Sequence, residues 1–279
     1  MPLASQWERL LKNQGVWVGS FTQVSPVGEI QNDTPTEVTL AAQNGGDKMR
    51  QEIRKWPPGQ STQETVLEYR SLGRGVLFCE DGAFSQGSMQ WSPVSEFGAE
   101  LGLIYGHERL RLALVFPRQA RVGRLTLIRE HLKGQMPTLR SPLAVDQLLG
   151  TWAGRSTTVY PDYQPETVIS SRLVLAVATT DTLTQTLSLN PGPTLSSQGQ
   201  RVGSTIQFSQ GDQPVTVLLL PSGASATFPS AIGPGQPFFL ELGWLITPTL
   251  RQRLIRNYDE RGTWISLTQV IEEKVTTDN

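Results

Sequence analysis

Residues from which catalytic and metal centres are most often built are scarce in this chain. Its 279 residues include one cysteine, Cys79, and two histidines, His107 and His131. A lone cysteine excludes a disulfide within the chain, and neither histidine stands at the spacing of a metal-ligand set. No catalytic triad or phosphate-binding loop can be recognised either. We therefore assign no catalytic residue, expect no metal, and do not expect an enzyme.

Long apolar runs and an excess of one charge are also missing. No run of 18 apolar residues occurs, so we expect no membrane span, and residues 1–13 lack the apolar core of a signal peptide. The formal net charge is −1, so no overall field attracts nucleic acid or an anionic membrane. We expect a globular, cytoplasmic protein that does not bind nucleic acid.

One pattern, however, occurs twice in the sequence. A short segment with helical spacing of its apolar residues, at 3–13 and again at 143–149, is each time followed by a Gly-x-Trp-x-Gly run. The glycines and tryptophans that open these runs are Gly15, Trp17, Gly150 and Trp152. We expect the glycines to end the helices and the tryptophans to lie in the core.

The closing parts of the two halves match in the same order. The matched residues are Glu100 with Glu241, Arg109 with Arg251, Arg111 with Arg253, and Gly123 with Gly262. Ordered matches at both ends predict an internal duplication. Pro, Gly, Thr and Ser at 133–141 indicate a linker, so we expect an N-terminal domain at 1–138 and a C-terminal domain at 139–279.

The remainder of each half has the alternation of short strands separated by turn residues, such as the predicted hairpin at Asp81-Gly82. A long antiparallel sheet exposes its edges unless it closes, and a barrel of eight to ten strands has room for one small ligand. The sequence therefore predicts an all-β fold of two tandem antiparallel barrels, each preceded by a short helix.

Two arginine pairs are the strongest candidates for ligand contacts. Strand alternation places Arg109 and Arg111 on one face of their strand, and Arg251 and Arg253 on one face of theirs. If these faces point into the barrels, paired guanidinium groups can meet a ligand carboxylate. If the faces point outward, these are solvated strand arginines, and the sequence leaves both alternatives open.

Aromatic residues distinguish the two halves. Trp244 and Phe239 precede the second arginine pair, and a conjugated ligand would gain from stacking on such rings. The first half has Leu103 where the second has Trp244, and Leu125 where it has Trp264. We predict that the second barrel is the better ligand site, with Trp244, Phe239, Arg251 and Arg253 as its ligand-binding residues. Arg109 and Arg111 are the candidate ligand-binding residues of the first barrel.

The two Gly-x-Trp starts, each after a short helix, resemble the opening of the lipocalin and fatty-acid-binding superfamily. This resemblance implies a calycin barrel in which the tryptophan closes one end, often beneath a basic side chain of the closing strand. In the first half, the resemblance implies that Arg129 is this basic side chain. The aligned position in the second half is Thr268.

The end of the second half resembles the C-terminal signature of S-type phycobiliprotein lyases, cyanobacterial barrels that attach a linear tetrapyrrole to cysteines of antenna proteins. The residues behind this likeness are Trp244, Pro248, Leu250, Arg251, Arg253, Leu254, the GTWIS strand at 262–266, and Glu272. The whole layout is similar to an uncharacterised two-domain, lipocalin-like family of cyanobacteria and chloroplasts.

These resemblances imply a carrier or chaperone for a hydrophobic, carboxylate-bearing small molecule, a tetrapyrrole or related pigment, with no covalent cofactor. One alternative is a bilin lyase that delivers chromophore to an antenna protein by positioning it, with Glu241 or Asp259 as a candidate general acid. Another is an assembly factor with filled barrels that binds protein. A connected cavity in either barrel separates the first two hypotheses from the third.

Overall fold

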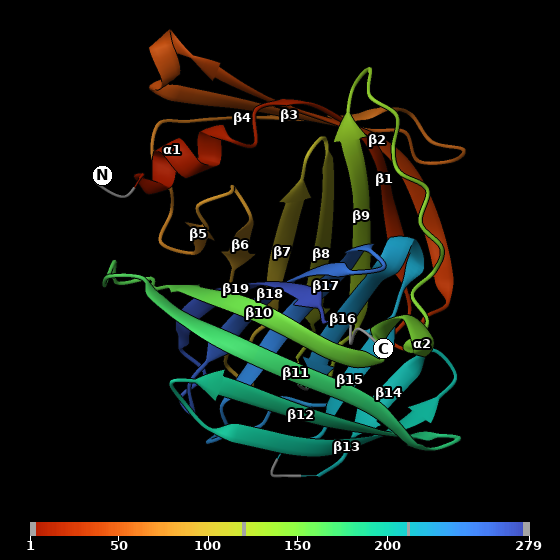
Figure 1. Ribbon diagram of the computed structural model, residues 1–279. Coiled ribbons are helices and arrows are strands. Elements are labelled where there is room, and N and C mark those ends of the chain that lie inside the picture. Colours follow the sequence, from red (N-terminus) through yellow and green to blue (C-terminus); the bar gives the residue numbers. More distant parts are fainter. Residues whose placement is uncertain (1–3, 119–120, 211–212, 276–279) are drawn as a thin grey trace.

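The computed structural model describes residues 4–118, 121–210 and 213–275. Two antiparallel sheets in tandem contain most of these residues, the first drawn red to yellow-green and the second green to blue in Figure 1. The prediction of an all-β fold with a short helix before each sheet is confirmed.

The first sheet has nine strands in the order β4-β3-β2-β1-β9-β8-β7-β6-β5. Their bounds are β1 (Gly15–Val24), β2 (Ile30–Gln43), β3 (Lys48–Lys55), β4 (Gln63–Tyr69), β5 (Val76–Phe78), β6 (Phe84–Gly87), β7 (Phe97–Tyr105), β8 (Glu108–Phe116) and β9 (Arg124–Leu132), with a short 3-10 turn, η1 (Asn44–Gly46), after β2. The predicted hairpin at Asp81-Gly82 joins β5 to β6, where Phe78 pairs with Phe84.

This first sheet curls into a half-barrel without closing. Within the described residues its edge strands β4 and β5 do not pair with each other. β5 is only three residues long and therefore offers few hydrogen bonds to a partner. The side chain of Gln6 in the first helix binds its Phe78, donating to the carbonyl oxygen at 3.0 Å. The first half is thus an open sheet closed off by a helix, where the sequence predicted a closed barrel.

The second sheet is a closed barrel of ten strands, because β10 pairs with both β11 and β19. The strands are β10 (Gly150–Val159), β11 (Thr167–Thr179), β12 (Thr182–Asn190), β13 (Thr194–Val202), β14 (Thr205–Phe208), β15 (Val215–Leu219), β16 (Ala224–Pro229), β17 (Phe238–Thr247), β18 (Leu250–Tyr258) and β19 (Trp264–Lys274), with η2 (Pro221–Gly223) before β16. Closure leaves this half without an exposed sheet edge.

The two helices precede the two sheets at equivalent places. α1 (Gln6–Leu11) begins with a capping box of Ser5 and Glu8. α2 (Val145–Leu148) is shorter and begins after Ala144. None of the described helices is long and apolar enough to cross a membrane.

The two tryptophans of the Gly-x-Trp runs occupy matching positions. Trp17 and Trp152 have exposed fractions of 1% and 0%. The indole Nε1 of Trp17 donates to the carbonyl oxygen of Asn13, and that of Trp152 donates to the carbonyl oxygen of Leu148, both at 2.9 Å. The predicted core role of both rings is therefore confirmed, and each ring anchors the end of its helix.

The halves pack against each other through the outer faces of their sheets, as Figure 1 shows for β7 and β8 beside β17. Leu101 and Leu112 of the first sheet belong to the same buried cluster as Leu240 and Leu254 of the barrel. The two sheets are separate, but they share this core. The division near residue 138 into independent domains stays a prediction.

Candidate functional site

Both arginine pairs point toward the interior of their own half. On β18, Arg251 and Arg253 line a cavity inside the barrel, together with Phe239 and Glu241 of β17. On β8 of the first half, the guanidinium carbon of Arg109 lies 4.4 Å from the ring centre of Trp17. The inward alternative left open by the sequence is therefore the observed one, while the ligand role of these residues stays a prediction.

The barrel cavity has a volume of about 520 Å³, within the usual range for small-molecule sites. Arg251, Arg253 and Glu241 form a charged patch on its wall. The apolar part of the wall includes Leu148, Leu173, Leu187, Ile206, Phe208 and Phe239. A connected cavity with a small polar patch is thus present in the second half, as a carrier or a lyase requires.

In the barrel, the charged patch is incompletely hydrogen-bonded. Arg251 Nε donates to Glu272, and Arg253 Nη1 donates to Glu241 Oε2 at 3.2 Å. Arg253 Nε lies 3.3 Å from Glu272 Oε1 without forming a hydrogen bond. Among the described residues, Arg251 Nη2 and Glu272 Oε2 have no hydrogen-bond partner. The patch therefore has hydrogen-bonding capacity to spare beside the cavity.

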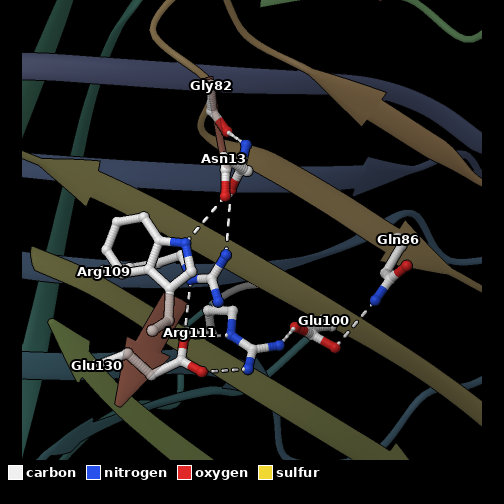
Figure 2. A network of polar contacts seen from close by, with 8 residues as sticks. Asn13, Gly82, Gln86, Glu100, Arg109, Arg111 and Glu130 are labelled. Carbon is white, nitrogen blue, oxygen red and sulfur yellow. Dashed lines mark hydrogen bonds and ion pairs between the residues drawn. The ribbon is translucent and has the colours of Figure 1, made fainter. Parts of the chain in front are cut away.

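The first half contains an equivalent cluster with more of its bonds made, which Figure 2 shows. Arg111 donates to Glu130 from Nε at 3.0 Å and from Nη2 at 2.8 Å, and to Glu100 from Nη1 at 2.6 Å. Arg109 Nε donates to Glu130 at 2.8 Å, and its Nη1 to the Asn13 amide oxygen at 3.4 Å. Here the chain itself supplies the anions that the arginines need.

The buried carboxylates of the two clusters are held in the charged form. Burial alone would raise the pKa of Glu130 and of Glu272, but the neighbouring guanidinium groups lower it below its usual value. For Arg111 and Arg253, burial is outweighed by the facing carboxylates, which raise the pKa. Glu130 and Glu272 are thus each held as a carboxylate between two guanidinium groups.

The structure does not bring Trp244 together with the arginine pair. Side chains alternate along β17, so Glu241 faces the cavity while Trp244 faces outward, with Arg140 of the linker 5.1 Å from its ring centre. Trp264 also lies away from the arginine pair, in the core between the halves, with the Arg256 guanidinium 3.5 Å from its ring centre. The prediction that Trp244 and Trp264 lie beside the arginine pair, made from their closeness in the sequence, was therefore wrong. Phe239 does line the cavity.

The basic group above Trp17 comes from a different strand than the resemblance implied. Arg129 faces the outside of β9, where its Nη2 donates to Thr22 at 2.8 Å. Glu130, its neighbour in the chain, takes the inward position. The cation over Trp17 is Arg109 of β8. Over Trp152, Arg251 of β18 and Lys274 of the closing strand β19 each lie 5.1 Å from the ring centre. The assignment of Arg129 was wrong because alternation turns it outward.

Sequence reasoning missed the central acid of the first cluster. Glu130 stands 142 residues before Glu272, the same offset that relates Arg109 to Arg251. This repeated spacing was the available signal, and it identifies the two glutamates as equivalent. The sequence analysis also missed a second pair of equivalent residues. Asn13, at the end of the first helix, binds Arg109, and its equivalent in the second half is Leu148, which lines the cavity.

The other residues considered for catalysis or metal binding make structural contacts. Asp259 accepts bonds at Oδ1 from the backbone of Arg261 and Thr263, so it orders the turn before β19. Burial raises the pKa of the Cys79 thiol well above its usual value. His107 Nε2 lies 2.9 Å from the Met136 carbonyl oxygen. In the part of the chain that the structure describes, no group of three or more metal-ligating side chains gathers.

In comparisons with known proteins, each half of the chain matches a family model. Residues 3–135 match the model of the N-terminal part of a domain of unknown function, DUF3598. Residues 139–275 match the C-terminal domain of "Biogenesis factor required for ATP synthase 1". A comparison with curated proteins found no match.

Among solved structures, a DUF3598-family protein of unknown function from Nostoc punctiforme is 42% identical, with a TM-score of 0.93. The match covers 98% of this chain and all of that one. An S-type phycobiliprotein lyase from Guillardia theta is 10% identical, with a TM-score of 0.36, over 48% of this chain and 91% of that one.

Proposed function

This chain belongs to the DUF3598 family, and from the geometry of its second barrel we propose that it carries a hydrophobic small molecule bearing a carboxylate. The observation that supports this is the cavity of about 520 Å³, whose wall combines apolar side chains with Arg251 and Arg253. The interiors of both halves contain an arginine pair, but the barrel of the second half also has room for a ligand beside it.

The charges at the cavity wall favour an anionic head group. Arg251 and Arg253 line the cavity with one carboxylate, Glu241, whereas Glu272 lies behind them with an exposed side-chain fraction of 1%. Arg251 Nη2 lacks an acceptor among the described residues. A small rotation of this side chain would offer the donor to a ligand carboxylate, in a bond that contributes about 1.5–3 kcal/mol.

The ligand body would be held by apolar contact and without a covalent bond. Burial in the Leu, Ile and Phe wall contributes about 25 cal/mol for each Å² of apolar surface removed from water. The single cysteine, Cys79, is buried in the first half, away from the cavity. We propose a linear tetrapyrrole or a related pigment as the leading ligand class, with Phe208 and Phe239 as its aromatic contacts.

The test uses the full chain, a linear tetrapyrrole, a long-chain fatty acid, and the methyl ester of each. Ser225→Phe should abolish binding of all of them, because Ser225 lines the cavity and faces Gly243 across the strand pair. The first half already tolerates a phenylalanine in this setting, where Phe84 faces Gly102. Ser225→Ala is the matched control.

We expect wild type and Ser225→Ala to bind the acids at least tenfold more tightly than the esters. Arg253→Gln should remove this preference while leaving the fold unchanged by near-ultraviolet circular dichroism. Equal binding by wild type and a folded Ser225→Phe variant would refute a carrier role for the barrel cavity. Covalent transfer of the tetrapyrrole to an antenna subunit in co-expression would replace the carrier proposal with a lyase.

A second candidate function is assembly of a protein complex, favoured by the name of the family model that matches residues 139–275. The filled interior of the first half suits such a role, because it needs no ligand. The discriminating measurement is the amount of assembled ATP synthase in cells lacking this chain. Restoration by Ser225→Phe would support a factor that works without the cavity, whereas restoration by wild type alone would couple assembly to the ligand.

A further inference from the structure

A second cavity, of about 480 Å³, lies between the halves and outside the barrel. Ser20 and Arg129 on the outer face of the first sheet form one side of it. Leu139 and Arg140 of the linker and Trp244 of β17 form the other. Neither the family resemblance nor the proposed carrier role accounts for this cavity.

The wall of this inter-half cavity has an excess of hydrogen-bond donors. Arg129 Nε and Trp244 Nε1 are buried nitrogens of lining residues, and neither has a partner within the described chain. Both are N–H donors. Since leaving a buried donor unsatisfied is unfavourable, the missing partner should be rich in acceptors.

The charge of the wall points to the same chemistry. On the side facing this cavity, two lining arginines, Arg129 and Arg140, outnumber one lining carboxylate, Glu108. Glu108 is already bound by Arg140 through bonds of 3.0 and 2.8 Å. Arg129 Nη2 donates to the hydroxyl oxygens of Thr22 at 2.8 Å and Ser20 at 3.3 Å. Its ion pair with Asp33 is loose, at 3.6 Å, and a third of its side chain is exposed. It is the cation available to a ligand.

Apolar surface lies beside these donors. Leu110 and Trp244 line the inner part of the cavity, and Leu139, with 96% of its surface exposed, lines its outer part. We propose that this inter-half cavity binds a small oxyanion with an apolar body. The head group would accept bonds from Arg129 and, after slight rotation, from the Trp244 indole, while the body lies along Leu110 and Leu139.

The experiment measures 1-anilinonaphthalene-8-sulfonate, a fluorescent oxyanion with an apolar body, on the full chain. The Ser225→Phe background fills the barrel cavity, so the remaining bound probe reports on the inter-half cavity. There we expect one site, which octanoate and octyl phosphate compete for and octanol does not. Comparing the concentrations of octanoate and octyl phosphate that displace the probe then tells whether a carboxylate or a phosphate head group is preferred.

Adding Arg129→Gln should weaken the remaining binding about tenfold or more, and adding Ser20→Phe should abolish it by filling the cavity. The controls are Arg124→Gln, an exposed arginine on the same strand, and Ser20→Ala. No remaining site in folded Ser225→Phe protein, or a site that neither Arg129→Gln nor Ser20→Phe affects, would overturn the proposal. Because the variants address separate cavities, this outcome leaves the barrel test unaffected.

Discussion

The two halves of the molecule contain the same four charges but differ in what surrounds them. Arg109, Arg111, Glu100 and Glu130 in the first half match Arg251, Arg253, Glu241 and Glu272 in the second. In the first half the cluster lies beside a packed interior, and in the second it lines a cavity. The ion cluster is therefore part of the barrel architecture, and other side chains decide whether a ligand fits.

One pair of equivalent positions accounts for much of this difference. Phe84 faces Gly102 in the first sheet, and Ser225 faces Gly243 in the second. A Cβ on Gly102 would lie 2.4 Å from the Phe84 ring, so the ring fills the space directly over this glycine. In the second half, the equivalent residue is Ser225, whose side chain is only a hydroxymethyl group. The space that a ring would fill there is part of the barrel cavity.

The largest expected effect tests this pair. Phe84→Ala should cost about 3–5 kcal/mol of unfolding free energy, because it leaves a void in a packed core. Ser225→Ala should change it by less than about 0.5 kcal/mol, because the side chain borders open space. Urea unfolding of the full chain measures both, and similar losses in the two variants would contradict the contrast between a filled and a hollow half.

The second prediction concerns the residue at the end of each helix. Asn13→Leu removes the hydrogen bond that Asn13 donates to Gly82 and the one that it accepts from Arg109. The free energy of unfolding should fall by about 1–3 kcal/mol. The reciprocal change, Leu148→Asn, should weaken binding of a carboxylate ligand roughly tenfold, because the new amide oxygen can accept from Arg251. Unfolding curves and ligand titration are the measurements, and tighter binding by Leu148→Asn would count against the proposed head-group site.

The smallest effect is the dependence of stability on pH. The pKa of Glu130 and of Glu272 is lowered in the folded state, so their stabilisation is complete above the unfolded value of about 4.3 and is lost as the pH falls through the folded value. Each unit of lowering contributes about 1.4 kcal/mol. Unfolding free energy measured from about pH 6 to pH 3 should fall less steeply in Glu130→Gln than in wild type.

Glu272→Gln provides the comparison for that slope. Glu130 accepts three hydrogen bonds from two arginines, whereas Glu272 accepts one and leaves Oε2 without a partner among the described residues. The change in slope should therefore be larger for Glu130→Gln. An equal change in both variants would mean that the two clusters are equally well bonded in solution.

Local patterns in the sequence predicted the parts of this fold that depend on local chemistry. The short helix before each sheet, the hairpin at Asp81-Gly82 and the burial of Trp17 and Trp152 were all predicted correctly. Alternation also placed each arginine pair on a single face. These features need only the propensities of neighbouring residues and the period of a strand.

The sequence could not show which of two buried faces points into a barrel. Along β8, the face with Leu110 and Leu112 has the composition of a barrel core, but it packs against the other half. Arg109 and Arg111 occupy the interior because Glu130, from a different strand, neutralises them. Trp244 was misplaced for the same reason, since its outward face is also buried.

At the contact between the halves, one residue meets its own equivalent. Phe97 opens β7 as Phe238 opens β17, and these equivalent rings touch each other with centres 5.6 Å apart. Contact between a residue and its own equivalent is characteristic of the axis of an isologous dimer. This contact, together with the repeated sequence, is what two copies of one subunit joined in a single chain would show. In such a tethered pair each copy can change alone, so one can lose its interior space while the other keeps it.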